Sequence, residues 1–277
     1  MAKARFLQRI NTRGPLYGQC NICGNFGKLT EDHTPPKSCG GITAAELRSL
    51  HDKLAAEGEQ SSAPRYFQGG VSYRTLCERC NGLLGTDYDP ALATMCAQVR
   101  AIAKSPLRLP QEVRLEIAPG SVMRSVLGHL AAQGVGRYLK GELTEPLRDY
   151  ILDSACPLPP SLRVHYWLYP HRRQVLIRDA ALLHLRTHAV FAFWLIKFFP
   201  VAFFVTISEP MQPVFQLRNL ENYRNSPAAV VDHVYLSIRN LVPGVWPETP
   251  TDESVILYGP EAVVAEPIRR LGRTPQR

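Results

Sequence analysis

The chain has 277 residues, of which 45% are hydrophobic and 20% are charged. This composition is typical of a globular protein and excludes long disorder, and the length predicts a small metal module beside one larger domain. The formal net charge of +8 and the pI near 9.2 favour a polyanionic partner, because basic groups that neutralise phosphates release condensed counterions.

Cysteine usage indicates a reducing, cytoplasmic environment. Seven cysteines would leave one over in an all-disulfide scheme, and the N-terminus lacks the apolar segment and cleavage site of a secretory signal. Cys39, Cys96 and Cys156 lie outside any paired spacing. We expect them to be ordinary small buried residues.

Residues 1–19 form the first segment and contain no acidic residue among the basic ones, Lys3, Arg5, Arg9 and Arg13. Two interpretations stay open for this arm. It is either a solvated tail or a segment that lies against the phosphates of a nucleic acid.

Two cysteine pairs follow, Cys20 with Cys23 and Cys77 with Cys80, each with two intervening residues. This spacing brings four thiolates to the corners of a tetrahedron around one structural zinc ion. The segment between the pairs is longer than in most zinc ribbons. It must therefore contain an insertion.

The segment Lys28–His33 reads as a short extended strand that ends in Asp32 and His33. Pro35 and Pro36 prevent a helix directly after it, because proline lacks an amide donor and restricts the residue before it. The acid and the histidine are therefore expected on a stiff exit from the strand.

Lys37 follows this exit and is placed to contact a phosphate. The insertion is predicted to hold a helix at Ile42–Glu57, with Leu47, Leu50 and Leu54 on one face. Val71–Leu76 is predicted to be the strand that leads into the second cysteine pair.

After Asn81, the sequence Asp89-Pro90 predicts a helix start, with Asp89 as the N-cap and the proline in the first turn. The helix is expected to run to about Lys104. A proline-containing linker follows at Ser105–Pro110, which places a domain boundary between residues 1–104 and residues 105–277.

The second part is predicted to be an α+β domain with a mainly antiparallel sheet. Helices are expected at Ser121–Gln133 and Leu143–Ser154, and strands at Leu162–Tyr169, Gln174–Arg178, Val190–Ile196 and Val201–Ile207. Asp232–Leu241 fits a helix or a strand. The apolar stretch Ala189–Ile207 approaches the length of a membrane span, but Lys197 and Pro200 near its middle favour two buried strands and no membrane partner.

The remaining histidines, His129 among them, lack a partner at ligand spacing except for His184 and His188, so we expect all of them to be structural. Several arginines, Arg178 included, lie among aromatic residues of the second part. They fit a nucleic-acid face or the solvated side of a sheet equally well.

The residues inside the cysteine clamp suit phosphodiester hydrolysis. Asp32 offers a carboxylate and Asn81 an amide oxygen, both of which are ligands for Mg²⁺. His33 titrates near neutral pH and is the natural base for the attacking water. In this interpretation zinc is structural, and a second ion, Mg²⁺ or Mn²⁺, is catalytic.

The order Cys-x-x-Cys, acid-His, Cys-x-x-Cys-Asn resembles the HNH endonucleases of the ββα-metal fold. It is most similar to the four-cysteine type seen in phage endonuclease VII, and Asp32 to Lys37 are similar to the bacterial subfamily with an E/D-H-x-x-P-K core. The resemblance covers residues 16–104. It implies a zinc-stapled, treble-clef-like HNH module with His33 as general base and Asp32 and Asn81 as magnesium ligands.

The expected activity is that of a metal-dependent HNH endonuclease that hydrolyses phosphodiester bonds in DNA. Its basic contacts would be Lys37, Arg5, Arg9 and Arg13. Residues 105–277 would position, assemble or regulate the module. The family analogy suggests antiviral defence in a bacterium or phage, with activity controlled by a homo-oligomer or a regulatory protein. The alternatives are an RNase of the same fold and a non-catalytic zinc module that binds nucleic acid.

Overall fold

The computed structural model describes residues 10–54, 64–138, 142–207, 217–239, 242–249, 253–259 and 261–268. The helices are α1 (Leu50–Leu54), α2 (Glu78–Leu83), α3 (Asp89–Ala103), α4 (Pro119–Ala132) and α5 (Thr144–Leu152). The strands are β1 (Tyr17–Gln19), β2 (Phe26–His33), β3 (Ala44–Ser49), β4 (Arg65–Gln68), β5 (Ser72–Cys77), β6 (Glu112–Ile117), β7 (Leu162–Leu168), β8 (Gln174–His184), β9 (Val190–Phe198), β10 (Val201–Ile207), β11 (Arg218–Asn219), β12 (Asp232–Ser237), β13 (Ser254–Tyr258) and β14 (Val263–Pro267).

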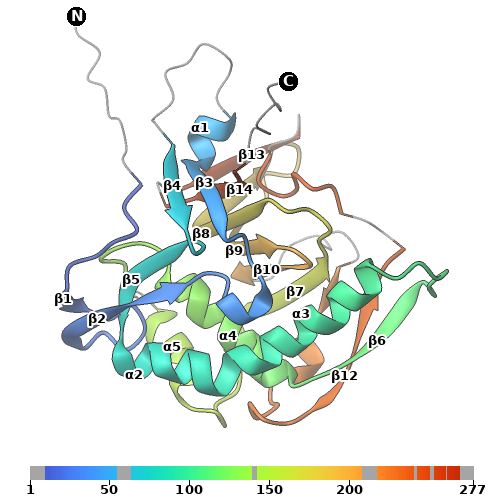
Figure 1. Cartoon of the computed structure of the whole chain (residues 1–277), viewed down its shortest axis with the longest axis horizontal. Coiled ribbons are helices and arrows are strands. Elements are labelled where there is room, and N and C mark those ends of the chain that lie inside the picture. Colours follow the sequence, from blue (N-terminus) through green and yellow to red (C-terminus); the bar gives the residue numbers. More distant parts are fainter. Residues whose placement is uncertain are drawn as a thin grey trace, which may run out of the picture.

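These elements form a mixed α+β fold with mainly antiparallel strands (Figure 1). Among the described residues, one sheet has the order β1-β2-β5, and a nine-stranded sheet has the order β11-β7-β10-β9-β8-β14-β3-β4 with β13 also paired to β8. A separate pair joins β12 to β6. The small sheet lies beside α2 and α3, and the large sheet lies behind them (Figure 1).

Several predicted elements are confirmed. Helices α4 and α5 occupy the expected positions, and β7, β9 and β10 match the predicted strands, while β8 continues beyond its predicted end to His184. The segment Asp232–Leu241, which fitted either a helix or a strand, contains strand β12. The most apolar stretch forms the neighbouring strands β9 and β10. In the described part of the chain, no helix is both long and apolar enough to span a membrane.

The helix predicted at Ile42–Glu57 is wrong for most of its length. The chain instead forms strand β3 and then the short helix α1, and residues 55–57 of the predicted helix lie outside the described residues. Strand β3 lies between β4 and β14 in the large sheet. Local helix propensity in this segment is only a weak preference, and pairing on both edges of the strand outweighs it.

Helix α4 lies at the centre of the molecule, and every one of its residues is buried. It contacts α3, β2 and β5 on the side of the cysteines and β8 and β9 of the large sheet. A helix covered on all sides is expected to be apolar all round. The exceptions in α4 are its buried polar residues, Ser121, Arg124, Ser125 and His129, each of which needs a partner.

Packing also joins the two segments that the sequence suggests as domains. Strand β3 of residues 1–104 pairs with β14 of residues 105–277. One hydrophobic core contains Leu92 from α3 together with Leu130 from α4. The boundary stays a prediction, but the second segment supports the first through sheet pairing and a shared core.

A second core covers the other face of the large sheet and encloses a buried ion pair. The Nζ atom of Lys197 lies 2.7 and 2.6 Å from the carboxylate oxygens of Glu248 and donates to the carbonyls of Gly244 and Trp246. Arg173 also donates to Glu248. These contacts hold the segment that follows Val242 against strand β9.

We expect Lys197→Met to lower the free energy of unfolding by about 3 kcal/mol, because it removes the main partner of a buried carboxylate. Lys53→Met is the matched control. Lys53 also pairs with a glutamate, Glu266, but both side chains are partly exposed, so its loss should cost less than about 1 kcal/mol. Denaturant unfolding followed by tryptophan fluorescence compares the two, and equal stabilities would contradict the prediction.

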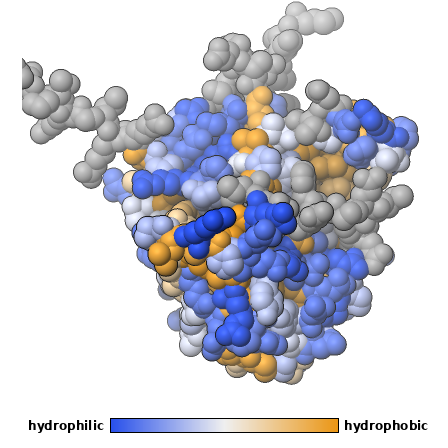
Figure 2. Space-filling model, turned by 90° about the vertical axis from the view of Figure 1, so that its right-hand side faces the viewer, coloured by the Kyte–Doolittle hydropathy of each residue, from blue (hydrophilic) through white to orange (hydrophobic). Residues whose placement is uncertain are grey.

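The surface seen in Figure 2 is largely hydrophilic where described residues are visible, and apolar residues form separate patches on it. Apolar residues on part of the surface are normal, because a folded protein has too little polar surface to cover itself completely. The apolar content of the chain is mainly used inside, in the two cores on either side of the large sheet.

Candidate metal centre and catalytic cluster

The cysteine pairs meet in one cluster. The Sγ atoms of Cys20, Cys23, Cys77 and Cys80 all lie within 4.8 Å of one another, and those of Cys23 and Cys77 are 3.8 Å apart. Tetrahedral zinc with bonds of about 2.3 Å places its sulfur ligands about 3.8 Å apart. The cluster therefore fits a metal ion such as zinc, as the spacing predicts.

Local geometry explains how the pairs converge. Between β1 and β2 the chain turns back on itself, with the amide of Cys20 bonded to Asn25 O and the amide of Gly24 bonded to Cys20 O. Gly24 has a φ of 73°, a conformation that glycine adopts without steric cost. The second pair lies where β5 ends and α2 begins.

Strand β2 presents the candidate catalytic residues at its end. Asp32 is opposite Tyr73 and His33 is opposite Ser72 in β5, after a register shift at Thr30 and Glu31. Alternation along the strand makes Asp32 buried and Glu31 exposed. Glu31 therefore points away from the face that carries Asp32.

Asn81 lies in α2, directly after the last cysteine, and faces β2. Its Nδ2 atom donates to Thr30 Oγ1 at 2.9 Å and to the carbonyl oxygen of Glu31 at 3.1 Å. Both acceptors are within two positions of Asp32 along the chain. The structure thus brings Asn81 to the strand end that carries Asp32 and His33.

The carboxylate of Asp32 is bound from an unexpected direction, by His129 of helix α4. His129 Nδ1 lies 2.8 Å from Asp32 Oδ2, and His129 Nε2 lies 2.9 Å from Asp89 Oδ1. Ser125 donates to the same Asp89 oxygen at 2.7 Å. The sequence predicts only a structural histidine here, and the structure shows that His129 directly contacts the proposed cation ligand.

Asp89 is also used differently from the prediction. It is the first residue of α3, the N-cap position falls on Tyr88, and Asp89 is 8% exposed. A buried carboxylate needs a charged or hydrogen-bonding partner, and His129 and Ser125 supply one. Sequence reasoning missed this because a cap pattern concerns only neighbours along the chain.

Burial and neighbouring carboxylates shift the pKa of His129 in opposite directions. Burial by itself lowers the pKa of His129, but the charges of Asp32 and Asp89 and the hydrogen bonds to them raise it well above the ordinary value. With a carboxylate at each ring nitrogen, both nitrogens act as donors, as in the imidazolium form. His129 therefore compensates two buried negative charges.

His33 has different surroundings, although it is the next residue after Asp32. It is partly exposed. Partial burial lowers its pKa most, and the positive charge of Lys37 lowers the pKa further. A lowered pKa keeps the ring neutral at physiological pH, which is the form that accepts a proton.

The chain matches no family model, and neither a curated protein nor a solved structure resembles it significantly.

Asp32 and Asn81 carry oxygen atoms of the kind that a hard divalent cation binds. Within the described part of the chain, the hydrogen bonds to the Asp32 carboxylate go to Oδ2, and those of the Asn81 amide come from Nδ2. Asp32 Oδ1 and Asn81 Oδ1 are thus the atoms that could hold Mg²⁺ or Mn²⁺. Asp32 is 3% exposed, so its carboxylate lies below the surface while His33 and Asn81 are nearer to it.

Of the four basic residues predicted to contact phosphates, the structure describes Lys37 and Arg13. Lys37 is exposed just beyond the strand end. Arg13 is exposed and lies 3.7 Å from Glu31, which also pairs with Arg74. Arg5 and Arg9 lie outside the described residues.

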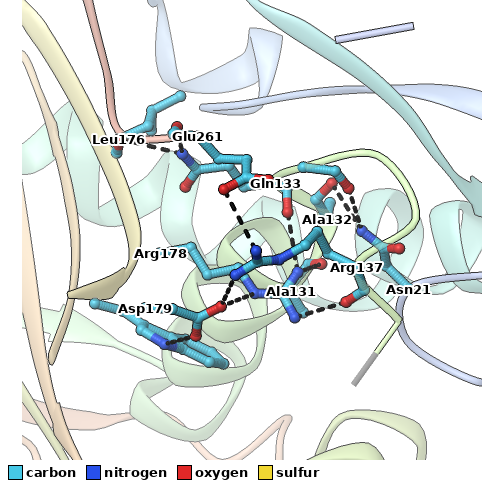
Figure 3. A network of polar contacts seen from close by, with 11 residues as sticks. Asn21, Ala131, Ala132, Gln133, Arg137, Leu176, Arg178, Asp179 and Glu261 are labelled. Carbon is cyan, nitrogen blue, oxygen red and sulfur yellow. Dashed lines mark hydrogen bonds and ion pairs between the residues drawn. The ribbon is translucent and has the colours of Figure 1, made fainter. Parts of the chain in front are cut away.

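Arg178 is wrongly predicted as part of a solvated or nucleic-acid face. It is 3% exposed, and its guanidinium donates to the carbonyls of Ala131, Gln133 and Arg137 (Figure 3). Helix C-termini carry unpaired carbonyls and partial negative charge. Arg178 satisfies these carbonyls at the end of α4.

Proposed function

We propose that the chain is an HNH-type endonuclease that hydrolyses phosphodiester bonds in DNA with Mg²⁺ or Mn²⁺. The observation that carries the proposal is the convergence of Asp32, His33 and Asn81 on strand β2 and helix α2, beside the cysteine cluster. The order strand, strand, helix with an acid-His pair and an asparagine is what the ββα-metal resemblance implies.

Each residue has a role that its chemistry allows. Asp32 and Asn81 would hold the cation, which when bound neutralises charge on the scissile phosphate. His33 would accept a proton from the attacking water, for which its lowered pKa is suitable. Exposed Lys37 would contact a neighbouring phosphate, and the cysteines would hold structural zinc.

Supercoiled plasmid incubated with the full chain tests the proposal. We expect nicked or linear product with Mg²⁺, none without added metal, and none with EDTA. Excess Mg²⁺ added after a brief EDTA treatment should restore cleavage, which separates the catalytic ion from the zinc. A protein that retains zinc and binds the plasmid without cutting it would contradict the proposal and favour the non-catalytic zinc module.

The nearer alternative is an RNase of the same fold, because the hydrolytic residues would serve either nucleic acid. Single-stranded and duplex forms of DNA and RNA, offered separately at equal nucleotide concentration, distinguish the two. Cleavage of RNA alone would overturn the DNA assignment. It would leave the roles of His33, Asp32 and Asn81 in place.

For the biological role, we propose a defence effector in a bacterium or phage, on the family analogy alone. A freely active nuclease would damage its host, so a regulatory protein or a homo-oligomer would control it. Expression in a bacterial host gives a direct readout, since loss of viability should require His33.

A further inference from the structure

The contact between His129 and Asp32 assigns part of the candidate centre to the second segment, residues 105–277. We infer that His129 is a positioning residue that orients Asp32 toward the catalytic cation. This inference rests on the proposed function, because it concerns the same cation. Its physical basis is that carboxylate ligands of metal ions are themselves held by hydrogen bonds from neighbouring side chains.

The geometry of the pair favours such a role. His129 Nδ1 binds Asp32 Oδ2 at 2.8 Å, which fixes the rotation of the carboxylate and leaves its other oxygen for a ligand. Thr34 Oγ1 lies 3.4 Å from the same Oδ2. The two oxygens of Asp32 therefore have different surroundings before any cation binds.

His129 is itself fixed at its other nitrogen. Asp89 accepts from Nε2 at 2.9 Å and from Ser125 at 2.7 Å, and His129 is 1% exposed. The chain of contacts Ser125, Asp89, His129, Asp32 allows the imidazole ring one orientation. Because the ring is held in place, its hydrogen bond also holds the Asp32 carboxylate in place.

The helix that carries His129 is anchored on the side of the cysteines. Asn21, which lies between the first two cysteines, donates to the carbonyls of Ala132 and Gly134. Thr75 of β5 donates to Ala132 O at 2.6 Å. The loop of the metal cluster is thus bonded to the end of α4 through Asn21 (Figure 3), and strand β5 is bonded to it through Thr75.

The same helix end is anchored to the large sheet. Arg178 of β8 donates to the carbonyls of Ala131 and Gln133 at 2.7 and 2.9 Å, and Gln133 donates to Leu176 O and Glu261 O. Figure 3 shows Asn21 and Arg178 reaching this helix end from different sides. The position of His129 thus depends on both halves of the chain.

A purely structural ion network is the competing explanation, and paired variants separate the two. Asparagine can place its amide nitrogen near the position of Nδ1, so His129→Asn keeps the donor to Asp32. Glutamine can place its nitrogen near Nε2, so His129→Gln keeps the donor to Asp89 and loses the one to Asp32. A positioning role predicts different cation affinities, whereas a structural role predicts similar ones.

The measurement is Mn²⁺ binding to zinc-loaded, full-length protein by electron paramagnetic resonance, without nucleic acid. We expect H129Q to bind Mn²⁺ about 10- to 100-fold more weakly than the wild type, and H129N to lie much closer to the wild type. Asp32→Asn identifies the site by abolishing the binding. Ser121→Ala is the matched control, because it removes another buried hydrogen bond of α4 and should leave Mn²⁺ affinity unchanged.

Equal Mn²⁺ affinities of H129N and H129Q, or wild-type affinity in H129Q, would overturn the inference, as would a wild type that binds no Mn²⁺ at this site. If H129Q does not fold, the wild type provides the test: the imidazole ¹⁵N resonances of His129 should shift on addition of Mg²⁺, and unchanged resonances count against it. Mn²⁺ binding that is weakened in H129Q, in a wild type that cuts no nucleic acid, would support the inference and refute the nuclease.

Discussion

Replacing His33 with alanine is expected to lower the rate of plasmid cleavage by about 10²- to 10⁴-fold, the usual contribution of a positioned general base. His33 is partly exposed at the end of β2, so its removal leaves no buried charge and should not affect folding. The cleavage rate with saturating Mg²⁺ is the quantity to measure. Zinc content and thermal unfolding should match the wild type.

His51→Ala is the matched control for this result. His51 is a histidine whose side chain is 78% exposed, and it lies in α1, outside the cluster of Asp32 and Asn81. Its loss should leave cleavage unchanged. Full activity in the His33→Ala protein would exclude His33 as the base and would transfer that role to another group.

The second large effect is expected from Cys77→Ser. A structural zinc ion contributes about 10–16 kcal/mol of apparent binding energy in small zinc domains, which is comparable with the whole stability of a typical domain, about 5–15 kcal/mol. The variant should lose bound zinc, and the small sheet should unfold. Metal analysis and near-ultraviolet circular dichroism measure the two consequences.

The unfolding should extend beyond the cysteine loop. Asn21 and Thr75 tie this region to the end of α4, so loss of the metal should also lower the Tm of the large sheet. Cys156→Ser is the matched control, since Cys156 lies outside the cluster and should keep the zinc. One zinc per chain and a wild-type Tm in the Cys77→Ser protein would contradict the zinc assignment.

Features that depend on neighbouring residues can be predicted from the sequence and agree with the structure. The spacing within each cysteine pair is set by a local turn, so it indicates a shared cluster before any fold is known. Asp32 and His33 follow each other along a strand, and alternation places one inside and the other nearer the surface. The apolar run forms two strands because Pro200 in the turn between them cannot continue a helix, whereas Lys197 lies within β9 and is buried against Glu248.

Features in which distant contacts compete with local preference could not be predicted in this way. The segment from Ile42 has helix-forming residues, yet most of it is strand β3, because β4 and β14 provide hydrogen-bonding partners on both edges. Arg178 alternates within a strand like a solvated residue, but the carbonyl end of α4 lies over it. Neither partner can be identified from the surrounding sequence.

The sequence alone therefore determined the cysteine cluster, the order of the strand and helix that carry Asp32, His33 and Asn81, and the mixed α+β class. Only the tertiary structure decided that His129 binds Asp32, across 97 positions of the chain. Spacing rules describe groups that a single turn or strand brings together, whereas this pair meets because a wholly buried helix packs between two sheets. The buried carboxylates of Asp32 and Asp89 then require a partner, His129, that no local sequence pattern specifies.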